Sequence, residues 1–237
     1  MSDPFAEALH DYQFDEQRGT LRYRNGTTTE DADVGLYFDE FDPESGSFLD
    51  TWLDGPLLDL GAGAGRHALY FQEQFETVAI EHSELLVEVL RDRGVEDARK
   101  ADMFALPDTF ERDRFASALA IGTQMSLSRS MQGLREFLGD LAYVTGPDGT
   151  AVIDGFDPDH ETTADMLDYY DDPTDGLAYR VLQFEYDGTL GEPWLYRLFT
   201  PDRVREAAVG TGWEVADIRF GDGEWDHNFQ VALRKLW

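Results

Sequence analysis

Apolar residues occur along the chain in two alternating patterns. Short, nearly continuous apolar runs are typical of strands buried on both faces. Apolar residues three or four positions apart, as at Leu134, Phe137, Leu138 and Leu141, indicate amphipathic helices. The patterns predict strands at 57–60, 78–80, 98–101, 115–121 and 150–153, and helices at 66–75, 85–93 and 131–143. This alternation predicts an α/β fold, with a parallel sheet covered by helices on both faces.

The first fifty residues precede the alternating core. We expect residues 1–50 to form an N-terminal cap segment and residues 51–237 to form the main domain. In the cap segment, the pattern predicts a small hairpin whose strands are 12–14 and 20–23, and a helical stretch at 36–41.

A second segment, residues 157–200, interrupts the core and is predicted to be an insertion. Within it, alternating strands at 179–186 and 194–199 flank a glycine-bearing loop, which predicts a β-hairpin that could cover a substrate pocket. Thr200 and Pro201 are a helix N-cap followed by proline in the first turn. The remaining predicted elements are a helix at 201–209 and strands at 214–220 and 229–234.

The charge of the chain narrows the choice of partners. The 237 residues include 49 acids and 19 bases, which gives a net charge of -30. Such a surface repels phosphates, so a nucleic-acid partner is disfavoured. Two explanations stay open: adaptation to high salt, as in a halophile, or a field that steers a cationic acceptor.

Composition also bears on location and metals. There is no cysteine, so disulfides and thiolate metal sites are excluded. No apolar run would span a membrane and no signal-peptide pattern is present, so we expect a cytoplasmic protein. The acids and histidine at 157–161 resemble a metal cluster, but acids are abundant throughout the chain and we predict no metal.

A glycine-rich turn, D-L-G-A-G-A-G-R-H at 59–67, follows the first core strand. Glycine tolerates positive φ and lacks Cβ, so a ligand can lie directly on such a backbone. The third glycine, Gly65, comes too early for the dinucleotide pattern, and Arg66 and His67 replace the Lys-Ser/Thr pair of a phosphate loop. Asp59 would repel a phosphate and suit an ammonium group, so the turn favours a zwitterionic ligand without phosphate.

This motif resembles the first motif of class I S-adenosylmethionine-dependent methyltransferases. The resemblance runs from about residue 57 to about residue 156. It implies a three-layer αβα sandwich with a mostly parallel seven-stranded sheet whose last strand is antiparallel, here with a small β-hairpin insertion. It also implies that Gly61, Ala62, Gly63 and Gly65 cradle the methionine part of S-adenosylmethionine and that Asp59 helps to hold its amino group.

Further cofactor residues are expected where later strands end. Glu81 lies about twenty residues beyond the start of the turn, the offset at which a strand-end acid meets a ribose diol. The resemblance implies that His82 lies beside the adenine, through its backbone rather than its ring. It also implies that Asp102 binds the exocyclic amine and that Met103 packs on the ring. Ile121, at the end of the strand 115–121, completes the predicted cofactor set.

Candidate acceptor residues lie in the loops and in the insertion. In the resembled family, the loop that contains Gln124 faces the transferring methyl group, and an N-terminal segment folds across the cofactor mouth, where Tyr37 would lie. Arg180 and Arg197 could bind an acceptor carboxylate, and Tyr196 lies between them in the predicted hairpin. Each has a structural alternative: Tyr37 packs a helix, Gln124 caps one, the arginines pair with nearby acids and Tyr196 packs across strands.

The implied reaction is in-line attack by a small-molecule acceptor on the sulfonium methyl. The cofactor is already activated, so the protein supplies alignment and a dry pocket. His82, His160, Glu185 and Tyr196 are conceivable bases, and nothing in the sequence selects one. A nicotinamide-dependent oxidoreductase and a non-catalytic binding protein remain alternatives. We expect a monomer or a homodimer.

Overall fold

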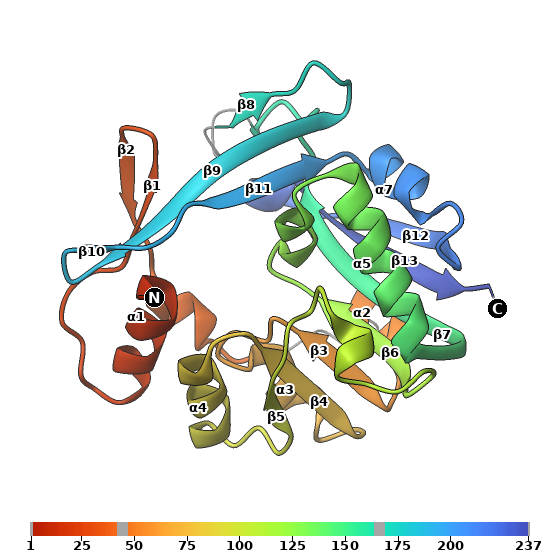
Figure 1. Ribbon diagram of the computed structural model, residues 1–237, viewed down its shortest axis with the longest axis horizontal. Coiled ribbons are helices and arrows are strands. Elements are labelled where there is room, and N and C mark those ends of the chain that lie inside the picture. The colour runs from red at the N-terminus through yellow and green to blue at the C-terminus, as the bar shows by residue number, and fades with distance from the viewer. Residues whose placement is uncertain (1, 42–46, 164–168, 237) are drawn as a thin grey trace.

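The computed structural model describes residues 2–41, 47–163 and 169–236, and it contains two β-sheets (Figure 1). The larger sheet has seven strands in the order β12-β13-β7-β6-β3-β4-β5. Its strands are β3 (Leu57–Leu60), β4 (Thr77–Glu81), β5 (Ala98–Lys100), β6 (Phe115–Ala120), β7 (Thr145–Phe156), β12 (Trp213–Phe220) and β13 (Asn228–Lys235). The five strands from β7 to β5 are parallel, and β13 runs antiparallel to both β7 and β12. The predicted sheet is therefore confirmed.

Helices cover both faces of this sheet because successive strand residues point to opposite sides. On one face, Leu58 and Leu60 pack with α5 (Met131–Val144) and α7 (Pro201–Ala208). On the other face, Leu57 packs with the short helices α2 (Phe48–Trp52) and α3 (Arg66–Phe71), and Ala79 packs with α4 (Glu84–Asp92). The αβα sandwich is confirmed. None of the described helices combines the length and apolar character needed to cross a bilayer.

The second sheet brings together distant parts of the chain. Its central strand, β9 (Leu177–Tyr186), pairs antiparallel with β11 (Trp194–Phe199), which confirms the predicted hairpin. The sheet is larger than predicted because β9 also pairs with β1 (Arg22–Asn25) of the N-terminal segment. The short strands β2 (Thr28–Asp31), β8 (Tyr170–Asp171) and β10 (Thr189–Leu190) complete it. In Figure 1, β9 spans the molecule from the side of α1 to the side of α7.

The predicted N-terminal hairpin is wrong. Residues 12–13 are the end of the helix α1 (Pro4–Gln13), which Asp3 caps by accepting a hydrogen bond from the Ala6 amide at 3.1 Å. The helix buries Leu9 against the second sheet, a contact that local sequence does not reveal. The actual hairpin is β1 and β2, which turn at Gly26 with a φ of 60°.

Two other local predictions differ from the structure. Only 36–37 of the stretch predicted to be helical at 36–41 are helical, as the end of the 3-10 helix η1 (Val34–Tyr37), and 38–41 lie outside any helix. The Asp33 carboxylate caps η1 by accepting a hydrogen bond from the Gly35 amide. The predicted strand at 150–153 is only part of β7, which begins at Thr145 and has a register shift against β6 between Phe115 and Ser117. The division into a cap segment and a main domain stays a prediction.

Candidate functional site

The glycine turn joins β3 to α3 at the carboxyl edge of the parallel sheet. The amides of Gly61 and Ala62 donate to the Ile80 carbonyl at 3.0 and 3.2 Å, so the turn is fastened to β4. Gly61, Gly63 and Gly65 have φ values of 65°, 58° and 87°, a region in which a side chain would be strained. The local sequence thus forces an exposed backbone loop at the edge where α/β sheets bind ligands.

The three glycines have different surroundings. A Cβ on Gly65 would meet Leu90 and Val95 of the α4 region at 2.9 Å, so this glycine permits close packing. A Cβ on Gly61 would meet the Gln124 side chain at 2.6 Å. A Cβ on Gly63 would have no described atom within 4 Å. Gly63 therefore opens onto free space, where a ligand can approach the backbone.

Two buried acids lie at or near the ends of the strands beside this turn. Glu81 is 6% exposed, and its Oε1 and Oε2 accept hydrogen bonds from the amides of Gly63 at 2.7 Å and His82 at 3.1 Å. Asp59 is 3% exposed, and its Oδ2 has no hydrogen-bond partner among the described residues. Burial and then the nearby Glu81 charge raise the pKa of Asp59 to about 7. A buried carboxylate oxygen without a donor is suited to a cationic ligand.

The ring of His82 lies between two carboxylates. Its Nε2 is 3.4 Å from Asp3 Oδ2, and its Nδ1 is 3.5 Å from Glu81 Oε2. The hydrogen bond with Asp3, and then that with Glu81, raise the pKa of His82 to about 10 although burial opposes this. The side chain is therefore an imidazolium at neutral pH.

The residues predicted to contact adenine lie on neighbouring strand ends. Lys100 pairs with Glu81 in the sheet, so Asp102 and Met103 follow at the same edge. Asp102 is exposed, and its Oδ1 accepts the Phe104 amide at 2.9 Å in a local turn. Met103 is half-buried against the main core, and Ile121 is half-buried beside α2 and α3. Their predicted contacts with a cofactor stay predictions.

Gln124 reaches the glycine turn from the loop after β6. Its Nε2 donates to the Gly61 carbonyl at 3.4 Å. The buried acid Asp154 at the end of β7 holds this loop, because its Oδ1 accepts the Thr123 amide at 2.6 Å. Burial raises the pKa of Asp154 to about 6, although hydrogen bonds from the loop amides lower it. Asp154 was not among the predicted site residues; its only sequence signal is its position at a strand end.

Arg93 is a second residue that the prediction missed. From the C-terminal end of α4, its Nη1 donates to the Ala64 carbonyl at 2.5 Å and its Nη2 to the Phe38 carbonyl at 2.9 Å. Its guanidinium also lies 5.0 Å from the centre of the Phe38 ring. Arg93 thus ties the segment after η1 to the glycine turn. An arginine in an amphipathic helix gives no sequence signal of this role.

Three of the predicted acceptor residues lie at one face of the second sheet. We call this face, which carries Tyr196, the inner side of the sheet. Tyr196 lies opposite Arg180 in the register of β11 and β9, so both side chains are on one face. Burial and then the nearby Tyr37 raise the pKa of Tyr196 above its ordinary value. Tyr37 in turn packs against Phe5 with ring centroids 5.2 Å apart. The structure therefore brings Tyr37, Arg180 and Tyr196 together.

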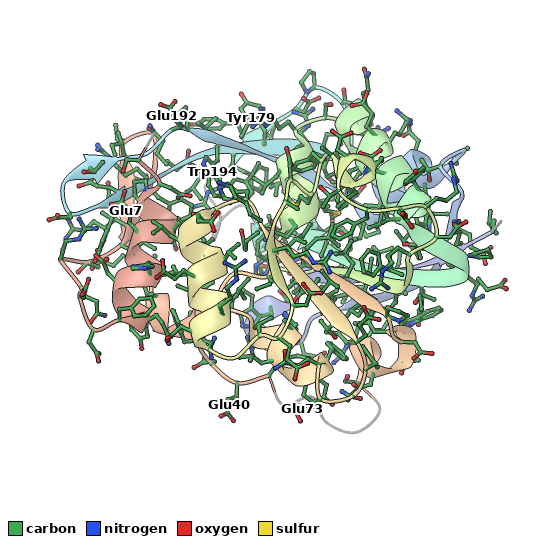
Figure 2. All side chains as sticks on the ribbon, turned by 60° about the horizontal axis from the view of Figure 1, so that its bottom comes forward. Glu7, Glu40, Glu73, Tyr179, Glu192 and Trp194 are labelled. Carbon is green, nitrogen blue, oxygen red and sulfur yellow. The ribbon has the colours of Figure 1, made fainter. Side chains whose placement is uncertain are left out.

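Arg197 is on the opposite face of β11, because neighbouring strand residues alternate. It forms an ion pair with Asp172, and both side chains are 16% exposed. Figure 2 shows the same alternation, with Trp194 directed inward and Tyr179 outward. The structure thus separates Arg197 from the other candidates and supports its alternative role in a pair with a nearby acid.

Metal ligation finds no support in the described residues, where no group of three or more His, Asp or Glu side chains could hold an ion. The acids near 157 instead take part in local hydrogen bonds, such as that from the Asp159 amide to Asp157 Oδ1 at 3.0 Å. His160 Nδ1 lies 3.0 Å from the Thr162 hydroxyl.

No protein-family model and no curated protein sequence matches the chain. Solved structures do resemble it. A SAM-dependent methyltransferase from Bacteroides fragilis, in complex with S-adenosyl-L-homocysteine, is 22% identical with a TM-score of 0.79, over 99% of this chain and 95% of that chain. One from Methanosarcina mazei is 14% identical with a TM-score of 0.63, over 83% and 99%.

A third similar structure is the 1,6-didemethyltoxoflavin-N1-methyltransferase of Burkholderia thailandensis, with bound 1,6-didemethyltoxoflavin and S-adenosylhomocysteine. It is 20% identical with a TM-score of 0.52, over 76% of this chain and 70% of that chain. The chain therefore has the methyltransferase-like α/β fold. At these identities, the likeness concerns the fold, and the activity has to be argued from the site.

Proposed function

We propose that this protein is an S-adenosylmethionine-dependent methyltransferase that acts on a small molecule. Two observations on one strand-to-helix turn carry the proposal. A Cβ on Gly63 would meet no described atom within 4 Å, and Asp59, near the end of the strand before the turn, has a buried carboxylate oxygen with no hydrogen-bond partner among the described residues. The ligand that fits is cationic at one end and has hydroxyl groups for Glu81. S-adenosylmethionine has both features, and the similar solved structures include complexes with its product.

In this assignment, the chain supplies binding and orientation. Asp59 would accept the ammonium group, Glu81 the ribose hydroxyls, and the turn 61–65 would lie along the methionine part. Asp102 and Met103 would meet the adenine, as the resemblance implies. When bound, S-adenosylmethionine supplies an activated methyl group on sulfur, so alignment and water exclusion are the tasks left to the protein.

The acceptor would lie between Gln124 and the inner side of the second sheet. Gln124 contacts the glycine turn, and Tyr37, Arg180 and Tyr196 gather on the inner side of β9 and β11. A small molecule fits this proposal better than a nucleic acid, because a net charge of -30 repels phosphates. The similar Burkholderia thailandensis enzyme is a 1,6-didemethyltoxoflavin-N1-methyltransferase with bound 1,6-didemethyltoxoflavin.

No side chain in this site is assigned as a general base. Asp3 and Glu81 keep His82 protonated, and a raised pKa keeps the Tyr196 phenol protonated. Glu185 forms an ion pair with Arg24 at 3.4 Å, and His160 Nδ1 is hydrogen-bonded to the Thr162 hydroxyl. We therefore propose catalysis by approximation, with an acceptor that attacks in its neutral form. A cytoplasmic location, adaptation to high salt and a monomeric or dimeric state remain proposals.

Titration calorimetry tests the function. We expect S-adenosylmethionine and S-adenosylhomocysteine to bind and NAD to give no heat. Binding of NAD alone would favour the oxidoreductase alternative. Incubation with methyl-labelled cofactor and a fractionated metabolite extract should then transfer label to a small molecule. Cofactor binding without any transfer would favour the non-catalytic alternative.

A further inference from the structure

We propose that His82 is a positioning residue, which links the N-terminal helix α1 to the ribose-binding acid Glu81 and so couples cofactor binding to the seating of α1. This inference rests on the proposed function, since it takes Glu81 to bind the cofactor. It goes beyond that function because it assigns the ring of His82 a role and connects a remote segment to the cofactor site.

The first step of the argument is the position of the ring. His82 follows Glu81 at the end of β4, and its Nδ1 is 3.5 Å from Glu81 Oε2 while its Nε2 is 3.4 Å from Asp3 Oδ2. Asp3 is the N-cap of α1, and its other oxygen, Oδ1, accepts the Ala6 amide at 3.1 Å. One carboxylate of α1 therefore caps its own helix and contacts His82 at the same time.

The second step concerns Glu81. Its Oε1 accepts the Gly63 amide, and its Oε2 accepts the His82 amide and faces the His82 ring. The imidazolium thus holds the Glu81 side chain through Oε2. Its ring does not contact Oε1, which accepts the Gly63 amide. Burial raises the pKa of Asp3, but the hydrogen bond with His82, the hydrogen bonds from the Ala6 and Phe5 amides and the His82 charge together outweigh it. The pKa of Asp3 is therefore lowered, and its carboxylate stays ionised. Three groups of alternating charge are arranged in a line from α1 to the glycine turn.

The third step is the packing around the ring. His82 lies edge-on to Trp194 of β11 with centroids 6.3 Å apart, and Trp194 lies 6.3 Å from Phe5 of α1. Trp194 also stacks on Tyr196, one of the acceptor candidates, at 6.2 Å. His82 is therefore the point at which β4, α1 and the second sheet meet. A change in Glu81 on cofactor binding would reach α1 through one side chain.

The chain contains a matched control. His10 also connects α1 to α4, because its Nε2 is 3.4 Å from Glu88 Oε2. Glu88 is on the exposed side of α4 and is not part of the proposed cofactor site. The variant His10→Gln therefore removes a comparable contact of α1 without touching Glu81.

The experiment compares His82→Gln, Asp3→Asn, the double variant and His10→Gln in the full chain. Asparagine is as good an N-cap as aspartate, so Asp3→Asn removes charge and keeps the cap. The measurements are the S-adenosylhomocysteine Kd by calorimetry, and hydrogen exchange of the α1 amides with and without that ligand. Because His82 is 56% exposed, solvent weakens its ion pairs, and we expect about three- to fivefold weaker binding in His82→Gln and in Asp3→Asn, and no such loss in the control His10→Gln.

Two results distinguish coupling through His82 from a general loosening of α1: non-additive losses of affinity in the double variant, and the hydrogen exchange of the α1 amides. The double variant should bind no more weakly than the His82→Gln variant, because both substitutions break the same contact between His82 and Asp3. In wild type and His10→Gln, the ligand should slow exchange in α1, and this protection should be lost in His82→Gln and Asp3→Asn. Unchanged affinity in His82→Gln, additive losses, or no ligand-dependent protection of α1 would each overturn the inference. If the wild type binds S-adenosylhomocysteine and one of these three contradicting outcomes is found, only this inference fails. If the wild type does not bind S-adenosylhomocysteine, the proposed function fails as well.

Discussion

The two sheets of this molecule are built in different ways. The parallel sheet consists of short apolar strands that follow one another along the chain, and its candidate site is a backbone turn with two buried acids. The second sheet joins β1 to β9, so that Arg24 meets Glu185 across 161 positions of sequence. Its candidate residues are long side chains on strands, including Arg180 and Tyr196.

This difference supports the two roles proposed for the sheets. A turn made of backbone and glycine fits one ligand shape, and it suits a cofactor that does not vary. Side chains on a sheet can change without altering the strand pairing, and they suit an acceptor that differs between proteins of one fold. We therefore expect changes in the glycine turn to alter cofactor affinity and changes in the second sheet to leave it intact.

The largest effect is expected from Gly63→Val. The new side chain would fill the space that opens above the turn, and the backbone φ of 58° would strain it. We expect S-adenosylhomocysteine affinity to fall by at least about a hundredfold, or ~2.7 kcal/mol. Gly210→Val is the matched control, because Gly210 also has positive φ and no neighbour within 4 Å, but it follows α7. Similar loss of affinity in both variants would mean that strain alone explains the effect.

The next effect is expected from Glu81→Ala. This variant removes an acceptor for the ribose hydroxyls and leaves the Gly63 amide without its partner. We expect binding to weaken by about 1–3 kcal/mol, the range for lost hydrogen bonds to a charged group. The control is Glu84→Ala, three residues further on, whose exposed carboxylate lies 3.9 Å from Arg91. Calorimetry should show wild-type affinity in the control; a Glu81→Ala variant with wild-type affinity would remove Glu81 from the site.

A pH dependence should follow from Asp59. Its pKa of about 7 means that the ligand-free protein holds a proton there at acidic pH, whereas an ammonium group binds the ionised form. Binding therefore releases that proton, and affinity should rise with pH from about 5.5 to about 7, by up to about tenfold per unit. Calorimetry in buffers of different ionisation enthalpy measures the proton release.

The control for this dependence is Asp59→Asn, which should bind weakly and with a flat pH profile across the same range. Asp59 also affects the ligand-free fold. Its folded-state pKa is above its unfolded value, so its contribution to stability falls as pH rises from about 4 to about 7. Between about pH 4 and about pH 7, the stability of Asp59→Asn, measured by thermal unfolding, should therefore fall less than that of the wild type. A wild-type affinity that is constant with pH would contradict the assignment of Asp59.

The smallest effect on cofactor affinity is expected from the second sheet. Tyr196→Phe removes one hydroxyl on the inner face, and we expect S-adenosylhomocysteine affinity to stay within about twofold while methyl transfer to the extract falls. The control Tyr179→Phe changes the outer face, where the ring stacks on Tyr170 at 5.4 Å, and should leave both unchanged. Strong loss of cofactor affinity in Tyr196→Phe would remove the proposed division between the sheets.

The sequence predicts the parallel sheet well because its signals are local. The run before Asp59, the glycines after it and the acid at Glu81 all lie within 57–81, and strand order follows from the fold class. The outcome differs for the N-terminal segment. Local spacing does not show that Leu9 is buried in a helix against the second sheet, or that β1 pairs with β9. Such contacts depend on strands that are distant in sequence.

The same distinction applies to single residues. The positions of Glu81 and Asp59 near strand ends, beside a recognisable turn, are predictable from the sequence, and their contacts with a cofactor stay predictions. Arg93, which joins Phe38 to Ala64, and the His82 ring, which joins Asp3 to Glu81, are not predictable. Their roles depend on how the N-terminal segment returns to the sheet, and neither residue type nor spacing encodes that path.

The most direct test of the account is a crystal structure of the protein with S-adenosylhomocysteine. The account predicts that the ligand's ammonium group lies beside Asp59 Oδ2, its backbone above Gly63 and its ribose hydroxyls at Glu81. A nucleoside bound elsewhere, or a glycine turn closed against the ligand, would contradict the central claim that this turn is the cofactor site.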